Sequence, residues 1–299
     1  TAGGGGRRCN RAMVFHPYDV LHIYYLSGRL KPGSERFGSG YLGNWEEEDT
    51  SFLFFSRPAA DQIDGLLAAQ PHLNLVDTFQ MTYDQWQGGT IEPLTIGGFE
   101  LCPTWWPEDK AAACPNPRRL MLDPGLVFGS GTHPTTADCL EALETAFSRN
   151  AAETVLDLGT GTGVLALAAA ALGCPRVLAA DLNLLAAATA ARNVSANAME
   201  DRILVVQGRA EELIDCPAQL LAANIHYAVL EQMMAAAGFT AKAQVILSGL
   251  LRSDAKAAKE QLRLQGFRIV RSWEHEGTWF TLYAESAPAS HEEAAENRQ

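Results

Sequence analysis

The spacing of hydrophobic and polar residues changes partway along the chain, near residue 119. Beyond that point, short apolar runs typical of strands alternate with longer runs whose apolar residues recur at helical spacing. The expected strands are 153–159, 176–181, 202–208, 219–224 and 243–249. The expected helices are 164–173, 184–198, 229–239 and 253–265. This alternation predicts βαβ units, and therefore a parallel sheet covered by helices on both faces.

The end of the chain departs from this alternation. Residues 267–277 and 278–286 are typical of two strands joined by a tight turn, so we expect an antiparallel hairpin at one edge of the sheet. The polar residues 287–299 are expected to form a flexible tail. These features together predict an α/β domain over residues 121–286.

The first part of the chain predicts a smaller α+β domain over residues 13–80. Alternating apolar positions indicate strands at 19–28 and 45–56, and helical spacing indicates a helix at 59–70. Residues 75–86 are typical of a strand that continues into a loop.

Two further segments do not have the pattern of a packed domain. Residues 81–120 are rich in Gly, Pro and β-branched residues, so we expect a connector with short strands. Residues 1–12 combine glycine and charge without an apolar run, and we expect a disordered extension.

Composition narrows the class of protein. Of the 299 residues, 47% are hydrophobic and 19% are charged, which is enough apolar material for two packed domains. The formal net charge of −12 repels phosphate backbones, so direct nucleic-acid binding is disfavoured and a basic partner is favoured. The longest apolar run, 164–172, is far shorter than the ~20 residues that cross a bilayer, so we expect no membrane span.

The six cysteines are scattered and form no CxxC pair, and no histidine lies near them at metal-ligand spacing. We therefore expect no metal site, and we interpret the cysteines as reduced thiols of a cytoplasmic protein.

A glycine-rich turn follows the first strand of the alternating region. The motif VLDLGTGTG places Asp157 before Gly159 and Gly161, and Asp181 ends the next strand. Glycines at this point let the backbone turn sharply beside a ligand, and a carboxylate at the next strand end can accept hydrogen bonds from ribose hydroxyls. The GxGxG spacing differs from the dinucleotide GxGxxG. Because Asp157 suits a cationic group rather than a pyrophosphate, S-adenosylmethionine fits this turn better than a nicotinamide dinucleotide.

Another strand is expected to end at Asn224. Its amide carbonyl can accept a hydrogen bond from an attacking amine and direct the amine's lone pair at a methyl group. This position is similar to the Asn-Pro-Pro-Tyr site of amino-group methyltransferases, although an Asn at a strand end also serves as a turn or helix cap. His133 and His226 are interpreted as caps or hydrogen-bonding core residues rather than as catalytic groups.

Several segments together resemble the ribosomal protein L11 methyltransferase (PrmA) family. They are DPGLVFGSGTHPTT, VLDLGTGTGVLALAAAALG, LAADLNLLAAATAARN, LLAANI and VILSGLL. The resemblance runs from about Trp86 to Glu285. It implies a Rossmann-like, seven-stranded class I S-adenosylmethionine-dependent methyltransferase sheet with a smaller N-terminal α+β domain. In the family, that smaller domain recruits a ribosomal stalk protein and presents lysine or N-terminal amines for methylation.

The resemblance also implies roles for single residues. Asp157, Gly159 and Gly161 would cradle the methionine part of the cofactor, and Asp181 would contact its ribose. Phe128 and Thr132 would close over the cofactor, and Asn224 would contact the acceptor amine.

The chain departs from the family pattern at several positions, among them Thr160 and Thr162 in the glycine turn and the pair His226–Tyr227. Asn183 stands where a second acid is common, and Arg209 stands where an acid often meets the adenine amino group.

The predicted function is therefore transfer of methyl groups from S-adenosylmethionine to a basic ribosomal protein. Alternatives within the same chemistry are another protein acceptor or a small amine. Alternatives of another class are a nicotinamide-dependent oxidoreductase, against which the GxGxG spacing and Asn224 argue, and a non-catalytic cofactor-binding scaffold. The presence of Asp157, Asp181 and Asn224 argues against such a scaffold.

Overall fold

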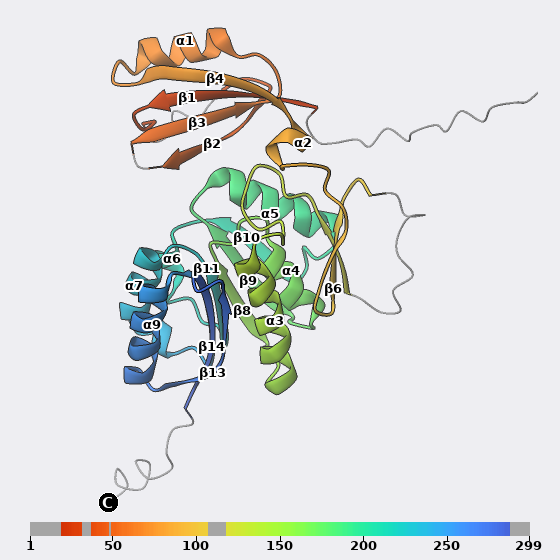
Figure 1. Ribbon diagram of the computed structural model, residues 1–299, viewed down its shortest axis with the longest axis vertical. Coiled ribbons are helices and arrows are strands. Elements are labelled where there is room, and N and C mark those ends of the chain that lie inside the picture. The colour runs from red at the N-terminus through yellow and green to blue at the C-terminus, as the bar shows by residue number, and fades with distance from the viewer. Residues whose placement is uncertain (1–18, 32–36, 48, 107–117, 288–299) are drawn as a thin grey trace, which may run out of the picture.

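The computed structural model describes residues 19–31, 37–47, 49–106 and 118–287, whose strands form a large group, a smaller N-terminal group and a short third sheet (Figure 1). The extension expected at 1–12 lies outside the described residues, as does the expected tail beyond residue 287. In the part of the chain that is described, no helix has the length and apolar character needed to cross a membrane.

The larger group is a seven-stranded sheet in the order β10-β9-β8-β11-β12-β14-β13. Its strands are β8 (Thr154–Leu158), β9 (Arg176–Asp181), β10 (Ile203–Gln207), β11 (Leu220–Asn224), β12 (Gln244–Leu250), β13 (Phe267–His275) and β14 (Trp279–Ser286). The strands from β8 to β12 pair in parallel, whereas β14 is antiparallel to β12 and forms a hairpin with β13. The predicted sheet and its antiparallel edge are both confirmed.

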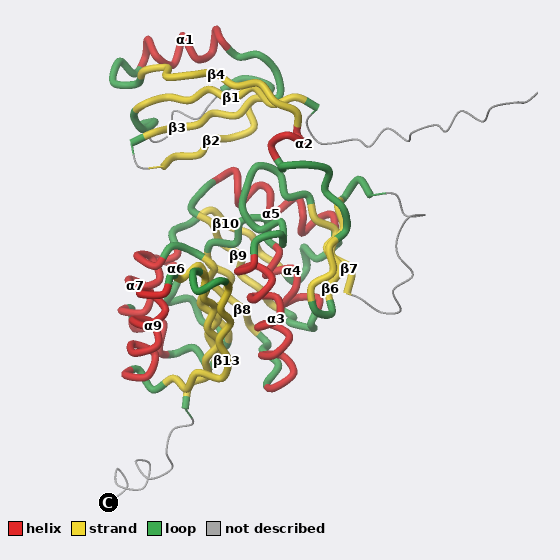
Figure 2. Tube along the Cα trace, in the orientation of Figure 1, coloured by secondary structure: helices red, strands yellow, loops and turns green. Residues whose placement is uncertain are grey.

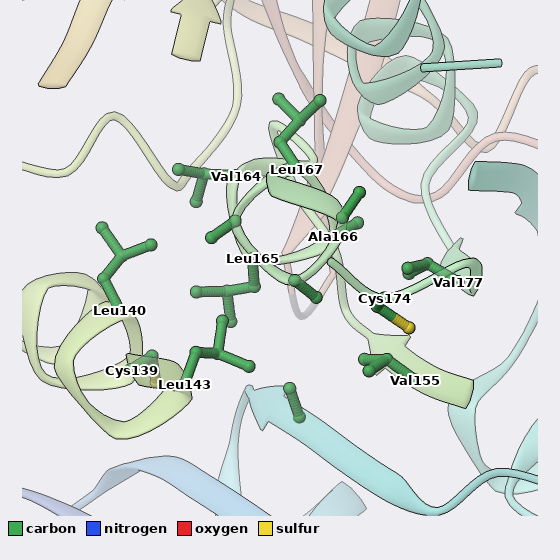
Figure 3. Close-up of a cluster of buried hydrophobic side chains, with 14 of the residues drawn as sticks. Cys139, Leu140, Leu143, Val155, Val164, Leu165, Ala166, Leu167, Cys174 and Val177 are labelled. Carbon is green, nitrogen blue, oxygen red and sulfur yellow. The ribbon is translucent and has the colours of Figure 1, made fainter. Parts of the chain in front are cut away.

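Helices cover both faces of this sheet. They are α3 (Pro134–Arg149), α4 (Val164–Ala171), α5 (Leu184–Ala196), α6 (Ala210–Leu213), α7 (Tyr227–Ala235), α8 (Ala237–Thr240) and α9 (Arg252–Leu264). Because successive side chains of a strand point to opposite faces, Val155 of β8 packs with α3 and α4, whereas Leu156 and Leu158 pack with α7 and α9. Figure 3 shows Leu140 of α3 and Leu165 of α4 in the first of these layers.

The smaller group is an antiparallel sheet in the order β2-β3-β1-β4. Its elements are β1 (Val20–Ser27), β2 (Tyr41–Glu47), β3 (Thr50–Phe55), α1 (Ala60–Ala69) and β4 (Asn74–Thr82), followed by α2 (Tyr83–Trp86). The prediction of one strand over 45–56 is wrong, because β2 ends at Glu47, β3 begins at Thr50, and the two strands pair in antiparallel fashion. The sequence between them contains neither Gly nor Pro, so the pattern alone did not mark this break.

Residues expected to form a connector build a third sheet from β5 (Leu94–Ile96), β6 (Phe99–Pro103) and β7 (Arg118–Leu122). Phe99, Leu101 and Leu120 of this sheet are buried in the same cluster as α3 and α4. The segment thus packs onto the large-sheet unit and is not an extended linker.

Both faces of the N-terminal sheet pack against other elements, although its edge strand β4 is largely exposed. The α1 helix packs on one face, with Ile63 and Leu66 buried. On the other face, Ile23 and Phe54 pack against Leu126, which precedes α3, and Leu185 of α5. Figure 2 shows α2 between the two groups of strands. This contact brings the N-terminal sheet to the carboxyl-end side of the large sheet, where the candidate site lies.

Candidate functional site

A cavity of about 830 Å³ opens at the carboxyl ends of β8, β9 and β11. Gly161, Asp181 and Asn224 all line it, together with Phe128 from the segment before α3. Crevices at the carboxyl ends of parallel strands are the usual ligand sites of open α/β sheets, and this volume is in the range of small-molecule sites. The structure therefore brings these four predicted residues into one site.

The glycine turn allows the preceding segment to approach β8 closely. Gly161 has a φ of +56°, and a Cβ there would overlap the carbonyl oxygen of Phe128. The backbone N–H of Thr162 donates to that carbonyl oxygen at 3.1 Å, and the Thr162 hydroxyl donates to the Gly129 carbonyl at 2.8 Å. The turn and the Phe128 segment are thus held together as one wall of the cavity.

Asp157 is fully buried beneath this turn and does not line the cavity. Its Oδ2 accepts hydrogen bonds from the Thr160 hydroxyl at 2.5 Å and from the Ala166 backbone N–H at 3.1 Å. Its Oδ1 has no hydrogen-bond partner among the described residues. Burial raises the pKa of Asp157 to about 7. The structure therefore gives this carboxyl contacts with the turn itself, whereas the resemblance implied contact with a ligand.

Asp181 ends β9 and faces the cavity. Its Oδ2 accepts the Gly161 backbone N–H at 3.0 Å, and its Oδ1 accepts the Asn183 backbone N–H at 2.9 Å. Burial raises its pKa, while these two hydrogen bonds oppose the rise. Each carboxylate oxygen has a further lone pair, so the group can still accept hydroxyl donors from a ligand in the cavity.

Asn224 ends β11, and its amide is oriented by a partner far away in sequence. The Asn224 Nδ2 donates to the Thr135 hydroxyl at 3.2 Å, and that hydroxyl lies 2.7 Å from His133 Nδ1. Burial is the main cause that lowers the pKa of His133, which favours the neutral ring with Nδ1 as an acceptor. The Thr135 hydroxyl can then donate to His133 and accept from Asn224. With its NH₂ so engaged, the amide presents its carbonyl oxygen as the acceptor group.

The resemblance implied that Phe128 and Thr132, both in the segment before α3, close over the cofactor, but only Phe128 lines the cavity. Phe128 lines the cavity with 45% of its surface exposed, and its ring lies 5.3 Å from that of His133. Thr132 is exposed, lies outside the cavity lining and bonds to the Ser130 hydroxyl at 2.8 Å. Thr136 lines the cavity instead, and its buried hydroxyl has no partner among the described residues.

Both histidines cap helices, as interpreted from the sequence. His133 accepts the Thr135 backbone N–H at the start of α3, and His226 accepts the Ala228 backbone N–H at the start of α7, each at 3.3 Å. Among the residues that the structure describes, no cluster of His, Cys, Asp or Glu could hold a metal ion.

The sequence reasoning missed one wall of the cavity. Asn44, Trp45 and Glu46 of β2 line it. Trp45 and Glu46 were expected to begin a strand at 45–56, but nothing in the sequence placed that strand beside the carboxyl ends of the parallel strands. Arg209 at the start of α6, already noted in the sequence as a departure from the family pattern, also lines the cavity and pairs with Glu211 at 3.1 Å.

Comparison with known proteins agrees with this geometry. The family model described as "Ribosomal protein L11 methyltransferase (PrmA)" matches residues 65–287. The chain belongs to this family. The family expected from the sequence is thereby confirmed, and the match includes every predicted site residue, from Phe128 to Asn224.

Curated relatives agree with the family assignment. Ribosomal protein L11 methyltransferases of Bacillus cytotoxicus and Bacillus cereus are each 36% identical over 191 residues, which is 63% of this chain. The aligned part spans 60% of the length of these relatives. A crystal structure of ribosomal protein L11 methylase from Lactobacillus delbrueckii subsp. bulgaricus has a TM-score of 0.56 and 27% identity. It covers 66% of this chain and 100% of that one.

Proposed function

We propose that this protein is an S-adenosylmethionine-dependent methyltransferase that modifies lysine or N-terminal amines of a basic ribosomal protein of the L11 type. The observation that carries the proposal is the shared cavity of Asp181 and Asn224, in which Thr135 holds the Asn224 amide with its carbonyl oxygen available. Membership of the family and the names of the relatives support the same reaction.

The residues of the cavity fit S-adenosylmethionine. Asp181 offers acceptor lone pairs for ribose hydroxyls, and the buried Thr136 hydroxyl offers a polar group with no partner among the described residues. Phe128 and Leu182 offer apolar surface. The cofactor supplies an activated methyl group on its sulfonium. We assign its binding to Asp181, the turn at Gly159 and Gly161, and Phe128, with Asp157 supporting the turn from below.

Asn224 performs the positioning that the reaction needs. Its carbonyl oxygen accepts an N–H of the incoming amine, which directs the nitrogen lone pair away from Asn224 and toward the methyl group. Methyl transfer of this kind is an in-line displacement, so orientation is the main contribution of the protein and no strong base is required. Thr135 acts through Asn224 as a positioning residue.

The charge of the chain supports a basic acceptor. A net charge of −12 attracts a lysine-rich protein and disfavours direct contact with nucleic acid. We assign recruitment of the acceptor to the N-terminal unit, residues 13–80. Its edge strand β4 is exposed along most of its length and includes the exposed apolar residues Leu75, Val76 and Phe79. An acceptor of the ribosome places the enzyme in the cytoplasm, away from membranes.

The test is transfer of labelled methyl groups to unmodified ribosomal protein L11. We expect the wild-type protein to label L11 and Asn224→Ala to lower the rate by about a hundredfold, because the amine loses its orienting contact. Asn150→Ala, at the far end of α3 and outside the cavity lining, is the matched control and should label at the wild-type rate.

Two results would contradict the proposal. An Asn224→Ala protein that labels L11 as fast as the wild type would remove the role of Asn224. Cofactor binding without labelling of L11, but with labelling of another protein or a small amine, would keep the chemistry and replace the acceptor.

A further inference from the structure

The N-terminal sheet forms one wall of the cavity that contains Asp181 and Asn224. Asn44, Trp45 and Glu46 of β2 line this cavity, although they precede Asp181 by more than a hundred residues. A ligand that fills the cavity would therefore contact two units of the fold.

One hydrogen-bond chain joins β2 to the carboxylate of Asp181. The Asn183 Nδ2 donates to the backbone carbonyl oxygen of Asn44 at 3.0 Å, and the Asn183 backbone N–H donates to Asp181 Oδ1 at 2.9 Å. Asn183 also caps α5, because its Oδ1 accepts the Leu185 N–H at 2.8 Å. Strand β2 therefore lies beside the 181–185 segment, which is the Asp181 end of the cavity.

Close backbone packing holds β2 in this place. Gly43 has a φ of +149°, and a Cβ there would lie 2.8 Å from the Leu185 Cβ. Leu185 is itself buried against Leu21, Ile23 and Phe54 of the N-terminal sheet. The close contact between β2 and the start of α5 therefore requires glycine at position 43, because any side chain there would collide with Leu185.

Large apolar side chains remain exposed at the same end of the cavity. Trp45 of β2 is 37% exposed, and Leu182 and Leu184 beside Asp181 are 58% and 50% exposed, while all three line the cavity. An aromatic side chain and two leucines around a carboxylate match a ligand that carries a flat heterocyclic ring on a ribose.

We propose that strand β2 completes the cofactor site at its adenosine end, with Trp45 as a cofactor-binding residue and Asn183 as the link between the two units. This inference rests on the proposed function. Because the cofactor would contact both units, its affinity depends on the docking of the N-terminal sheet, and cofactor binding strengthens that docking in return. Recruitment of the acceptor and binding of the cofactor are then coupled through β2.

The experiment is calorimetric titration of the full-length protein with S-adenosylhomocysteine. We expect Trp45→Ala to weaken binding about tenfold, in line with the loss of aromatic stacking on a base. We expect Asn183→Ser to weaken it about fivefold, because serine keeps a cap acceptor for α5 but cannot reach the Asn44 carbonyl. Leu264→Ala and Ser195→Ala, both outside the cavity lining, are the matched controls and should bind like the wild type.

Hydrogen exchange gives a second readout that does not depend on the variants. In the wild-type protein, the backbone amides of β2 should exchange more slowly when S-adenosylhomocysteine is added. Thermal unfolding without ligand shows whether each variant is folded.

The outcomes separate this inference from the proposed function. One outcome is that the wild type binds S-adenosylhomocysteine tightly while folded Trp45→Ala and Asn183→Ser bind it equally well and the exchange of β2 does not change. That result would overturn the role of β2 and leave the proposed function standing. A wild-type protein that does not bind S-adenosylhomocysteine would overturn the proposed function together with the inference.

Discussion

Replacing Asp157 by Asn is expected to remove a pH dependence of stability that this one carboxyl creates. Asp157 is fully buried, and burial raises its pKa from 3.8 to about 7. Because the folded pKa lies above the unfolded one, the stabilising effect of the protonated carboxyl is complete below about pH 4 and is lost as the pH rises through 7. An amide at this position does not titrate.

The magnitude follows from the shift in pKa. Each pKa unit corresponds to about 1.4 kcal/mol, so ionisation of Asp157 lowers the free energy of unfolding by about 4 kcal/mol in all. Between pH 5 and pH 8, where the unfolded carboxyl is already ionised, the expected loss is about 3 kcal/mol. Asn also places an unsatisfied N–H near the position of Oδ1, but that cost is the same at every pH.

The assay is urea unfolding of both proteins at several pH values from 5 to 8. The difference in free energy of unfolding, Asp157→Asn minus wild type, should rise by about 3 kcal/mol across this range. Thr160→Val removes the hydrogen bond that favours the ionised form, so it should move the pH-dependent loss to higher pH. Parallel curves for the wild type and Asp157→Asn would show that ionisation of Asp157 does not control the pH dependence of stability.

Two further variants test the turn and the acceptor side of the site. Thr135→Val should lower kcat about tenfold, because the Thr135 hydroxyl orients Asn224. The affinity for S-adenosylhomocysteine should stay unchanged, because Thr135 does not line the cavity. Thr135→Ser keeps the hydroxyl and should restore the rate. Equal loss of rate in Thr135→Ser would contradict this. Gly161→Ala should weaken cofactor binding more than tenfold and cost about 1–2 kcal/mol in urea unfolding, since its Cβ is strained and overlaps Phe128. Gly173→Ala carries a positive φ but meets no atom within 4 Å, so it should bind normally.

The residues of the site that could be predicted are those whose place in the sheet follows from the hydrophobic pattern of their own segment. Asp181 and Asn224 each follow an apolar run, and parallel strands end at the same edge of a sheet, so their meeting follows from the alternation of strands and helices. The glycine turn was found for the same reason.

The parts that were missed depend on contacts between distant segments. Thr135 meets Asn224 across 89 residues, and β2 reaches Asn183, beside Asp181, because the N-terminal sheet docks on α5. No periodicity within either segment carries that information. The burial of Asp157 was open to prediction, because it lies two residues after Val155 on the same face of β8, under α4.

We expect the cavity at the carboxyl ends of β8, β9 and β11 to bind the adenosyl cofactor of a methyltransferase. Calorimetric titration with S-adenosylhomocysteine and with NAD, on the wild-type protein and on Asp181→Ala, measures this binding. S-adenosylhomocysteine should bind the wild type, Asp181→Ala should lose most of this affinity, and NAD should not bind. Binding of NAD without binding of S-adenosylhomocysteine would overturn this assignment and favour an oxidoreductase.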